Sequence, residues 1–304
     1  MSTNNHWTAE SIPDQTGRIA IVTGANSGIG YETARALANK GATVIMACRN
    51  QEKGDAAARQ IRDEKPRATV ETMQLDLGDL DSVRAFADEF QRQYDRLDLL
   101  INNAGIMHPP LGKTKQGFET QFGVNHLGHF ALTGLLLDLI IRTPHARIVT
   151  VSSMAHRFGR IDFEDLNAEK GYRANAAYGQ SKLANLLFTY ELQRKLQAAG
   201  NGTIAVAAHP GWTATNLQQH SGVVRFFNHF FAQTSAMGAL PTLRAATAPD
   251  VQGGDYYGPG KRMEMVGYPI KVQSNGRSHD AEVAAQLWTV SEDMTGVRYQ
   301  GLGD

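Results

Sequence analysis

The sequence predicts an α/β protein with one doubly wound domain, in which a parallel sheet of about seven strands carries helices on both faces. The first observation behind this prediction is that short apolar segments alternate with amphipathic ones, without a polar linker or compositional break. The second is that the residues best suited to chemistry directly follow a predicted strand or lie on the helix after it. Doubly wound proteins bind ligands beyond the carboxyl ends of their strands, where such residues would meet.

Local periodicity predicts the individual elements in chain order. Strands are expected where short segments are continuously apolar or alternate apolar with polar residues: 19–22, 42–48, 69–75, 97–101, 147–152 and 203–208. Helices are expected where apolar residues recur three and four positions apart: 31–38, 51–64, 80–93, 118–141, 175–199, 236–248 and 280–290.

Residues 1–304 are predicted to form this one domain with three additions. Residues 1–17 are a polar lead-in that Trp7 and Ile12 fasten to the body. Residues 212–233 contain the aromatic run Phe226-Phe227-Asn228-His229-Phe230-Phe231 and are interpreted as a lid over an apolar substrate, with a lipid-facing surface or a subunit contact as the alternatives. Residues 250–304 are expected to be an irregular C-terminal extension.

Composition excludes several classes of function. Thirty basic residues balance thirty acidic ones, so no net field recruits nucleic acid. The single cysteine, Cys48, rules out an intrachain disulfide and fits a reducing compartment. The N-terminus is polar, and the longest apolar stretch, residues 130–141, is too short to span a bilayer. We therefore expect a cytoplasmic protein without a transmembrane segment.

A glycine-rich turn follows the first predicted strand, with the sequence Thr-Gly-Ala-Asn-Ser-Gly-Ile-Gly at residues 23–30. Such a turn brings backbone N–H groups and a helix N-terminus up to a phosphate. Gly24 suits the tight turn, Gly28 a close approach of the backbone to the ligand, and Gly30 close packing of helix on strand. An ordinary strand-to-helix turn is the alternative.

Tyr178 and Lys182 lie four residues apart on a predicted helix and therefore share one face. A neighbouring ammonium favours the phenolate and lowers the high pKa of tyrosine, which would make Tyr178 a proton shuttle. A plain surface contact is the alternative. Ser153, at the end of a strand, could bind a substrate oxygen or could cap the next element.

In combination these motifs resemble the short-chain dehydrogenase/reductase family, whose members have a Rossmann fold. The resemblance covers residues 18–217 and consists of motifs in the family's order: Thr23-Gly24-x3-Gly28-Ile29-Gly30, Asp76, Asn102-Asn103-Ala104-Gly105, Asn125, Ser153, Tyr178-x3-Lys182 and Pro210-Gly211. Three further segments are similar to the branch that contains retinol dehydrogenases, WW-domain oxidoreductases and protochlorophyllide reductases: residues 124–130, 181–185 and 287–292.

The resemblance implies catalytic roles. Tyr178 would exchange a proton with the substrate oxygen, and Ser153 would bind that oxygen. Lys182 would lower the pKa of Tyr178 and hold the nicotinamide ribose. Asn125 would hold a water that connects Lys182 to solvent. The cofactor would lie along Gly24, Asn26, Ser27, Gly28, Ile29, Gly30, Arg49, Asp76, Leu77, Asn103, Ala104, Gly105, Tyr178, Lys182, Pro210, Gly211, Thr213 and Thr215. No metal is expected, because the histidines lack partners at ligand spacing.

The end of the second predicted strand favours NADP(H) over NAD(H). An NAD site typically carries an acidic residue there to accept the ribose hydroxyls. Here Cys48 occupies that position and Arg49 follows, and a guanidinium matches a 2′-phosphate with charge-assisted hydrogen bonds. NAD(H) is the alternative, because Ser27 offers no second cation.

The predicted function is an NADP(H)-dependent alcohol dehydrogenase or carbonyl reductase that acts on a bulky apolar small molecule. Two other hypotheses are a non-catalytic NADP(H)-binding regulator on the same fold and a peripheral membrane protein that uses residues 226–231. The resemblance also implies a homo-oligomer, either a dimer or a tetramer.

Overall fold

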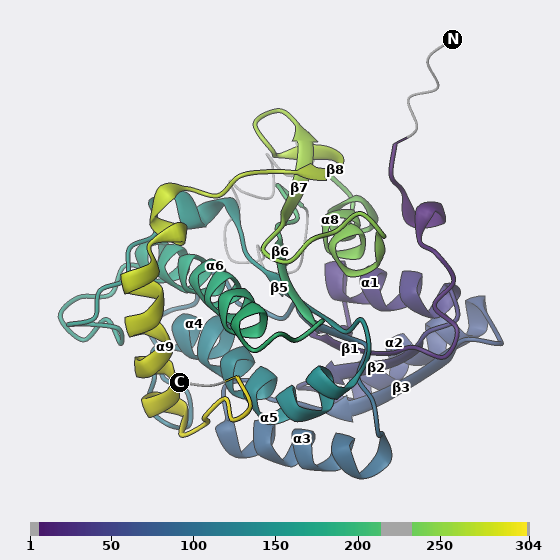
Figure 1. Ribbon diagram of the computed structural model, residues 1–304, viewed down its shortest axis with the longest axis horizontal. Helices are drawn as coiled ribbons and strands as arrows, with labels where there is room; N and C mark the ends of the chain where they lie inside the picture. Colours follow the sequence, from purple (N-terminus) through teal and green to yellow (C-terminus); the bar gives the residue numbers. More distant parts are fainter. Residues whose placement is uncertain (1–5, 214–232, 303–304) are drawn as a thin grey trace.

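The sheet is centred on strands that are apolar on both faces. The computed structural model describes residues 6–213 and 233–302. Its sheet has the order β3-β2-β1-β4-β5-β6-β7-β8 (Figure 1). The first seven strands run parallel and β8 is antiparallel to β7. The strands are β1 Ile19–Thr23, β2 Thr43–Cys48, β3 Thr69–Gln74, β4 Leu99–Asn102, β5 Arg147–Val151, β6 Ile204–Ala208, β7 Tyr256–Lys261 and β8 Val266–Lys271.

The strand order reverses at β1, which pairs with β2 on one side and with β4 on the other. At this point the connections diverge to opposite faces of the sheet and leave a crevice beyond the carboxyl ends of the strands. The doubly wound α/β fold predicted from the sequence is confirmed.

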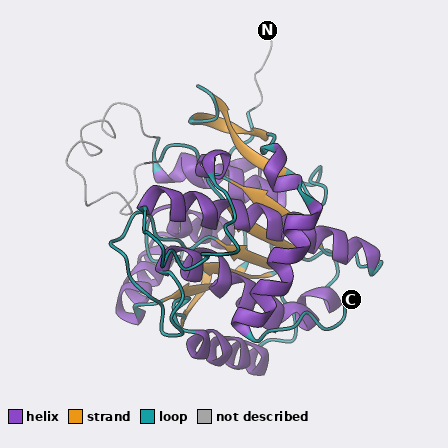
Figure 2. Ribbon diagram, turned by 90° about the vertical axis from the view of Figure 1, so that its left-hand side faces the viewer, coloured by secondary structure: helices purple, strands orange, loops and turns teal. Residues whose placement is uncertain are grey.

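Helices cover both faces of the sheet, as Figures 1 and 2 show. One buried cluster joins the sheet to α1, α2 and α8, and the other joins it to α3, α5, α6 and α9. The bounds are α1 Gly28–Asn39, α2 Gln51–Glu64, α3 Leu80–Gln93, α4 Thr120–Phe122, α5 Gly128–Arg142, α6 Ala174–Ala198, α8 Ser235–Thr247 and α9 Ala281–Thr295. Short helical turns are η1 Ala9–Ser11, η2 Gly123–Leu127, η3 Met154–Phe158 and η5 Gly276–His279.

The helix predicted over residues 118–141 contains a π-helical turn, η2, between α4 and α5. The segment Thr120–Arg142 is long and apolar enough to cross a membrane by length and composition, but 72% of its most apolar window is buried inside the fold. It packs as a core helix against α3 and the sheet. In the lead-in, Ile12 is buried in the core, and Trp7 packs against the same cluster, as expected.

The expectation that residues 250–304 are irregular is wrong. This part of the chain contributes β7 and β8, which bring the sheet to eight strands, and α9, which corresponds to the helix predicted over residues 280–290. Local pattern concealed the two strands because β7 and β8 each contain glycine and proline, which are depleted in strands. The prolines are tolerated because Pro259 lies at an irregularity in the pairing and Pro269 lies on the edge strand.

Candidate active site

A cleft of about 410 Å³ lies beyond the carboxyl ends of β1, β2 and β4. Many of the residues predicted from the sequence line it together: Gly24, Asn26, Ser27, Gly28, Ile29, Gly30, Arg49, Asp76, Leu77, Asn103, Ala104, Gly105, Tyr178, Lys182 and Pro210. Ser153, Asn125, Gly211 and Thr213 lie next to the cleft without lining it, and Thr215 falls outside the described residues.

The glycines of the turn serve distinct geometric needs. Gly24 and Gly28 have φ angles of 66° and 57°, in the left-handed region that L side chains rarely adopt. A methyl group on Gly24 would lie 3.0 Å from Ala104, and one on Gly30 would collide with the Gly24 carbonyl oxygen. Bare backbone at these positions therefore lets the turn, α1 and the loop after β4 approach one another.

A buried hydrogen-bond network joins the turn to η2. Thr23 Oγ1 accepts from the backbone N–H groups of Asn103 and Ala104, both at 2.9 Å. His129 Nδ1 lies 3.0 Å from the Asn125 carbonyl oxygen, so this nitrogen carries the proton, and Nε2 accepts from Thr23 Oγ1 at 2.9 Å. Burial lowers the pKa of His129 to about 4, so the imidazole is neutral. His129 is a structural link rather than a metal ligand.

Tyr178 faces the cleft from α6 and lies next to Ser153. The Ser153 hydroxyl favours the ionised form of the Tyr178 phenol, while Ser153 Oγ accepts from the Ala155 N–H at 3.2 Å and so caps η3. Ser153 can therefore cap η3 and still present its hydroxyl group to a substrate oxygen. Ser152 donates to the Lys182 carbonyl oxygen at 2.8 Å, which leaves Ser153 as the hydroxyl group available to a substrate oxygen.

The pKa of Tyr178 differs from the sequence-based expectation. Burial raises it, and the neighbouring Ser153 hydroxyl only opposes that rise. Lys182 has its ammonium nitrogen 5.8 Å from the centre of the tyrosine ring, and its charge does not overcome the effect of burial on this pKa. Among the residues of the chain alone burial dominates, so Tyr178 is a protonated phenol, the form that can give a proton to a carbonyl oxygen.

Lys182 is buried, with 4% of its surface exposed. Its amine donates to the Val151 carbonyl oxygen at 3.1 Å, and Asn185 Nδ2 donates to the same oxygen at 3.1 Å. Burial lowers the pKa of Lys182 to about 8. The amine is thus mostly charged at neutral pH and loses its charge in mildly alkaline solution.

Asn125 lies in the π-helical turn and joins the loop after β4 to α6. Its Oδ1 accepts from the Ile106 N–H at 2.8 Å, and its Nδ2 donates to Ser181 Oγ at 2.9 Å. A methyl group built on Gly105 would lie 3.2 Å from Asn125 Oδ1 and 3.4 Å from Lys182 Nζ. The two polar groups therefore both face the position above Gly105.

Arg49 and Lys53 mark the end of the cleft at β2. Both are exposed, and neither forms an ion pair with a carboxylate among the described residues. Burial raises the pKa of Cys48 to about 11, so the residue before Arg49 is a neutral thiol. Lys53 was missed by the sequence analysis, although its place one helical turn after Arg49 was a usable signal.

A carboxylate from the β7–β8 hairpin supports the opposite side of the cleft. Glu264 lies 3.1 Å from His209 Nε2 and 2.8 Å from the Arg157 guanidinium. The Gly211 N–H donates to His209 Nδ1 at 3.2 Å, so the imidazole proton is on Nε2, and Nε2 donates to Glu264. The hydrogen bond from His209 lowers the pKa of Glu264, and burial lowers the pKa of His209. The hairpin thereby orients the turn at Pro210, which lines the cleft.

The backbone that presents Glu264 is strained. Arg262, Met263 and Glu264 have φ angles of 51°, 54° and 66°, and each left-handed non-glycine residue costs about 1 kcal/mol. Strain of this kind persists only where the surrounding structure determines it and is concentrated at functional sites.

We expect Glu264→Gln to lower kcat/KM about tenfold, because the turn at Pro210 would lose its charged support and displaced groups at an active site are costly. Steady-state kinetics and thermal unfolding would be measured together. Glu292→Gln is the control, since Glu292 also pairs with an arginine, at 2.9 Å, but lies on α9 away from the cleft. A Glu264→Gln variant with normal kinetics would show that the contact serves stability alone.

Comparisons with known proteins agree with this geometry. The family model of the short chain dehydrogenases matches residues 18–223. Retinol dehydrogenase 12 of Mus musculus is 44% identical over 290 residues, which cover 93% of this chain and 88% of that protein. Retinol dehydrogenase 14 of Mus musculus is 42% identical over 300 residues, with 92% and 86% covered.

Solved structures lead to the same family. An uncharacterised protein from Mycobacterium Paratuberculosis has 47% sequence identity and a TM-score of 0.82, with 97% of this chain and 99% of that chain covered. A short chain dehydrogenase from Shigella flexneri 2a, complexed with NADP, has 25% identity and a TM-score of 0.63, with 80% and 97% covered. With its Rossmann-like sheet and its retinol dehydrogenase relatives, the chain belongs to the short-chain dehydrogenase family of oxidoreductases.

Proposed function

We propose that the protein is an NADP(H)-dependent oxidoreductase that interconverts an alcohol and its carbonyl compound. The observation that carries the proposal is the meeting of Ser153, Tyr178 and Lys182 beside a cleft that begins at the glycine turn. A protein that only sensed the cofactor would not need a proton donor, a hydroxyl partner for it and a buried amine at one place. The geometry therefore favours catalysis over the regulatory alternative.

The cleft fits a dinucleotide, because the unobstructed backbone of Gly24, Gly28 and Gly30 faces it beside the N-terminus of α1. When bound, the nicotinamide supplies or accepts the hydride. Tyr178 gives its proton to the substrate oxygen during reduction and takes one during oxidation. Ser153 donates a hydrogen bond to the same oxygen as its charge develops.

Lys182 and Asn125 serve the proton pathway in this proposal. The Lys182 ammonium stabilises the tyrosinate that remains after proton transfer. The space above Gly105, between Asn125 Oδ1 and Lys182 Nζ, suits a water that returns the proton to Lys182 and so to Tyr178. Gly105→Ala would place a methyl group in this space and is expected to slow turnover, as measured by steady-state kinetics.

NADP(H) is the preferred cofactor in this proposal because Arg49 and Lys53 are two cations on the cleft wall without a carboxylate partner in the described part of the chain. We expect Arg49→Ala to raise the KM for NADPH about tenfold, the usual scale for one charge-assisted hydrogen bond. The KM for NADH should not change, because that cofactor has no 2′-phosphate. Kinetics with both cofactors would be compared with Arg59→Ala, an exposed arginine on α2 outside the cleft. Equal effects on NADPH and NADH would contradict the assignment.

Turnover tests the proposal directly. The purified protein would be given NADPH with aldehydes and ketones, and NADP⁺ with the corresponding alcohols, while cofactor binding is followed by fluorescence. Binding and turnover are expected, with bulky apolar substrates preferred. Cofactor binding without turnover for every compound would instead favour the regulatory hypothesis.

The cytoplasmic location and the homo-oligomeric state remain predictions. The proposed lid, the membrane-contact hypothesis for residues 226–231 and the role of Thr215 concern residues outside those that the structure describes.

A further inference from the structure

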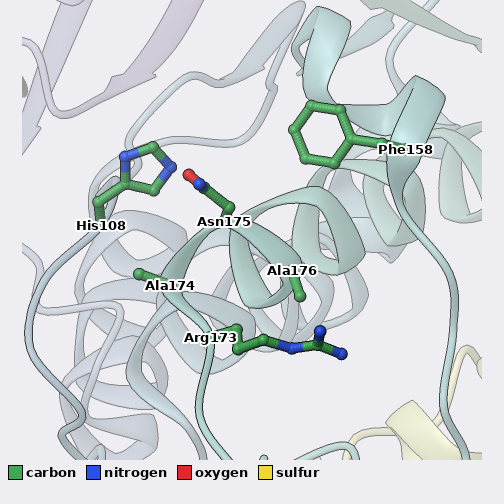
Figure 3. A pocket seen from close by; sticks show the side chains of 6 residues that line it. All are labelled: His108, Phe158, Arg173, Ala174, Asn175 and Ala176. Carbon is green, nitrogen blue, oxygen red and sulfur yellow. The ribbon is translucent and has the colours of Figure 1, made fainter.

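A second pocket of about 700 Å³ lies beside Tyr178, on the N-terminal end of α6. Its lining residues are His108, Phe158, Arg173, Ala174, Asn175 and Ala176 (Figure 3). His108 joins it to the catalytic group, because the imidazole and Tyr178 rings pack edge to face with centroids 5.5 Å apart. On the other wall Phe158 is 60% exposed and offers an apolar surface.

Asn175 and Tyr178 share one face of α6. They are three positions apart, so Asn175 lies about 4.5 Å along the helix axis from Tyr178. Figure 3 shows the Asn175 amide directed towards the His108 ring from across the pocket. The Asn175 amide favours the protonated imidazole, as expected where an amide oxygen faces a ring N–H.

This pair presents a donor and an acceptor to the pocket. When one ring N–H faces the Asn175 oxygen, the other nitrogen of a neutral imidazole is an acceptor, and the Asn175 amide has two N–H donors. His108 is exposed overall, and partial desolvation of its ring lowers its pKa. A hydroxyl group, which both donates and accepts, matches such a pair.

The loop that carries His108 is held in place without the imidazole. Its backbone N–H donates to Gln121 Oε1 at 2.9 Å, and the Gln121 amide in turn donates to the Ala174 carbonyl at 3.0 Å. Tyr172 adds a hydrogen bond to the Pro109 carbonyl at 2.7 Å. Because these contacts already join the loop to α6, the fold does not need the His108 and Asn175 side chains to hold the loop in place. The backbone of His108 is nonetheless left-handed, with φ 54°.

We infer that His108 and Asn175 recognise a hydroxyl group on the substrate, two or three carbons away from the carbonyl carbon that reacts at Tyr178. The substrate class is then a hydroxyaldehyde or hydroxyketone with an apolar body that packs on Phe158, and the reduced product is a diol. The inference rests on the proposed function, because Tyr178 must define the position of the reacting carbon.

The test compares two ketones that differ by one hydroxyl group, 2-octanone and 4-hydroxy-2-octanone, with NADPH and the full chain. Wild-type protein is expected to prefer the hydroxyketone about tenfold in kcat/KM, the usual scale for a polar contact in a partly open site. Asn175→Ala should abolish this preference by lowering kcat/KM for the hydroxyketone alone. Alanine suits a helix, so the fold should be retained. Gln197→Ala, an exposed amide at the far end of α6, is the matched control.

The outcomes separate this inference from the proposed function. Reduction of both ketones with equal kcat/KM, or a preference that survives Asn175→Ala, overturns the inference and leaves the proposed function intact. If wild-type protein binds NADPH and reduces neither these ketones nor any other carbonyl compound, the proposed function fails and the inference fails with it. Because His108→Asn keeps a residue that tolerates the left-handed backbone, it serves as the second variant and should also reduce the preference.

Discussion

Tyr178→Phe is expected to lower kcat about a thousandfold, within the range that a positioned general acid contributes. The phenylalanine ring keeps the packing against His108, and the change removes only the hydroxyl group beside Ser153. Affinity for NADPH, measured by fluorescence titration, should stay within twofold of the wild-type value. The result would separate binding from proton transfer.

Tyr190→Phe is the matched control, because Tyr190 lies on the same helix and its hydroxyl hydrogen-bonds to Ser274 at 2.8 Å, away from the cleft. We expect it to lower the free energy of unfolding by about 1 kcal/mol with little effect on kcat. If Tyr178→Phe retained a tenth of wild-type activity, the assignment of Tyr178 as proton donor would be wrong.

Lys182→Met is expected to lower kcat/KM at least a hundredfold, because the tyrosinate would lose its neighbouring charge in a water-poor site. The same change should leave the melting temperature unchanged or raise it. A buried charge is costly, and the Val151 carbonyl that Lys182 contacts keeps its hydrogen bond from Asn185. Lower activity together with equal or greater stability is typical of a residue retained for function. Lys195→Met on the same helix should leave kcat/KM unchanged.

The pH dependence gives a further test of Lys182. Its pKa is about 8 in the folded chain and 10.5 ordinarily, so the unfolded chain binds more protons between these pH values. The buried charged amine therefore lowers the free energy of unfolding by its full amount below about pH 8. This destabilisation disappears as the pH rises to 10.5. Wild-type protein should gain stability over this range relative to Lys182→Met, while its rate of carbonyl reduction falls. Parallel stability curves for the two proteins would contradict the assignment.

The sequence was most informative where an apolar strand is followed directly by residues suited to binding or catalysis. The strands from β1 to β6 are short and mostly apolar, and the motif residues follow them, so fold class and cleft could both be predicted. Spacing alone placed Tyr178 and Lys182 on one helix face, and the structure adds that burial outweighs the lysine charge in setting the pKa of Tyr178.

Features that depend on distant parts of the chain could not be predicted. The contact of Glu264 with His209 joins residues 55 positions apart, and it exists only because β7 and β8 form a hairpin beside β6. The link from Asn125 through His129 to Thr23 likewise depends on the packing of α5 against β1. No periodicity encodes such contacts, since they follow from tertiary packing.

The β7–β8 hairpin also limits how copies of this chain can associate. β8 ends the sheet, and its middle residue Pro269 has no N–H group to offer to another chain. The Pro269 carbonyl oxygen already accepts from Arg244 of α8 at 2.8 Å. Strand-by-strand growth of a continuous intermolecular sheet is therefore blocked at this end, and copies that assemble here must meet through side chains.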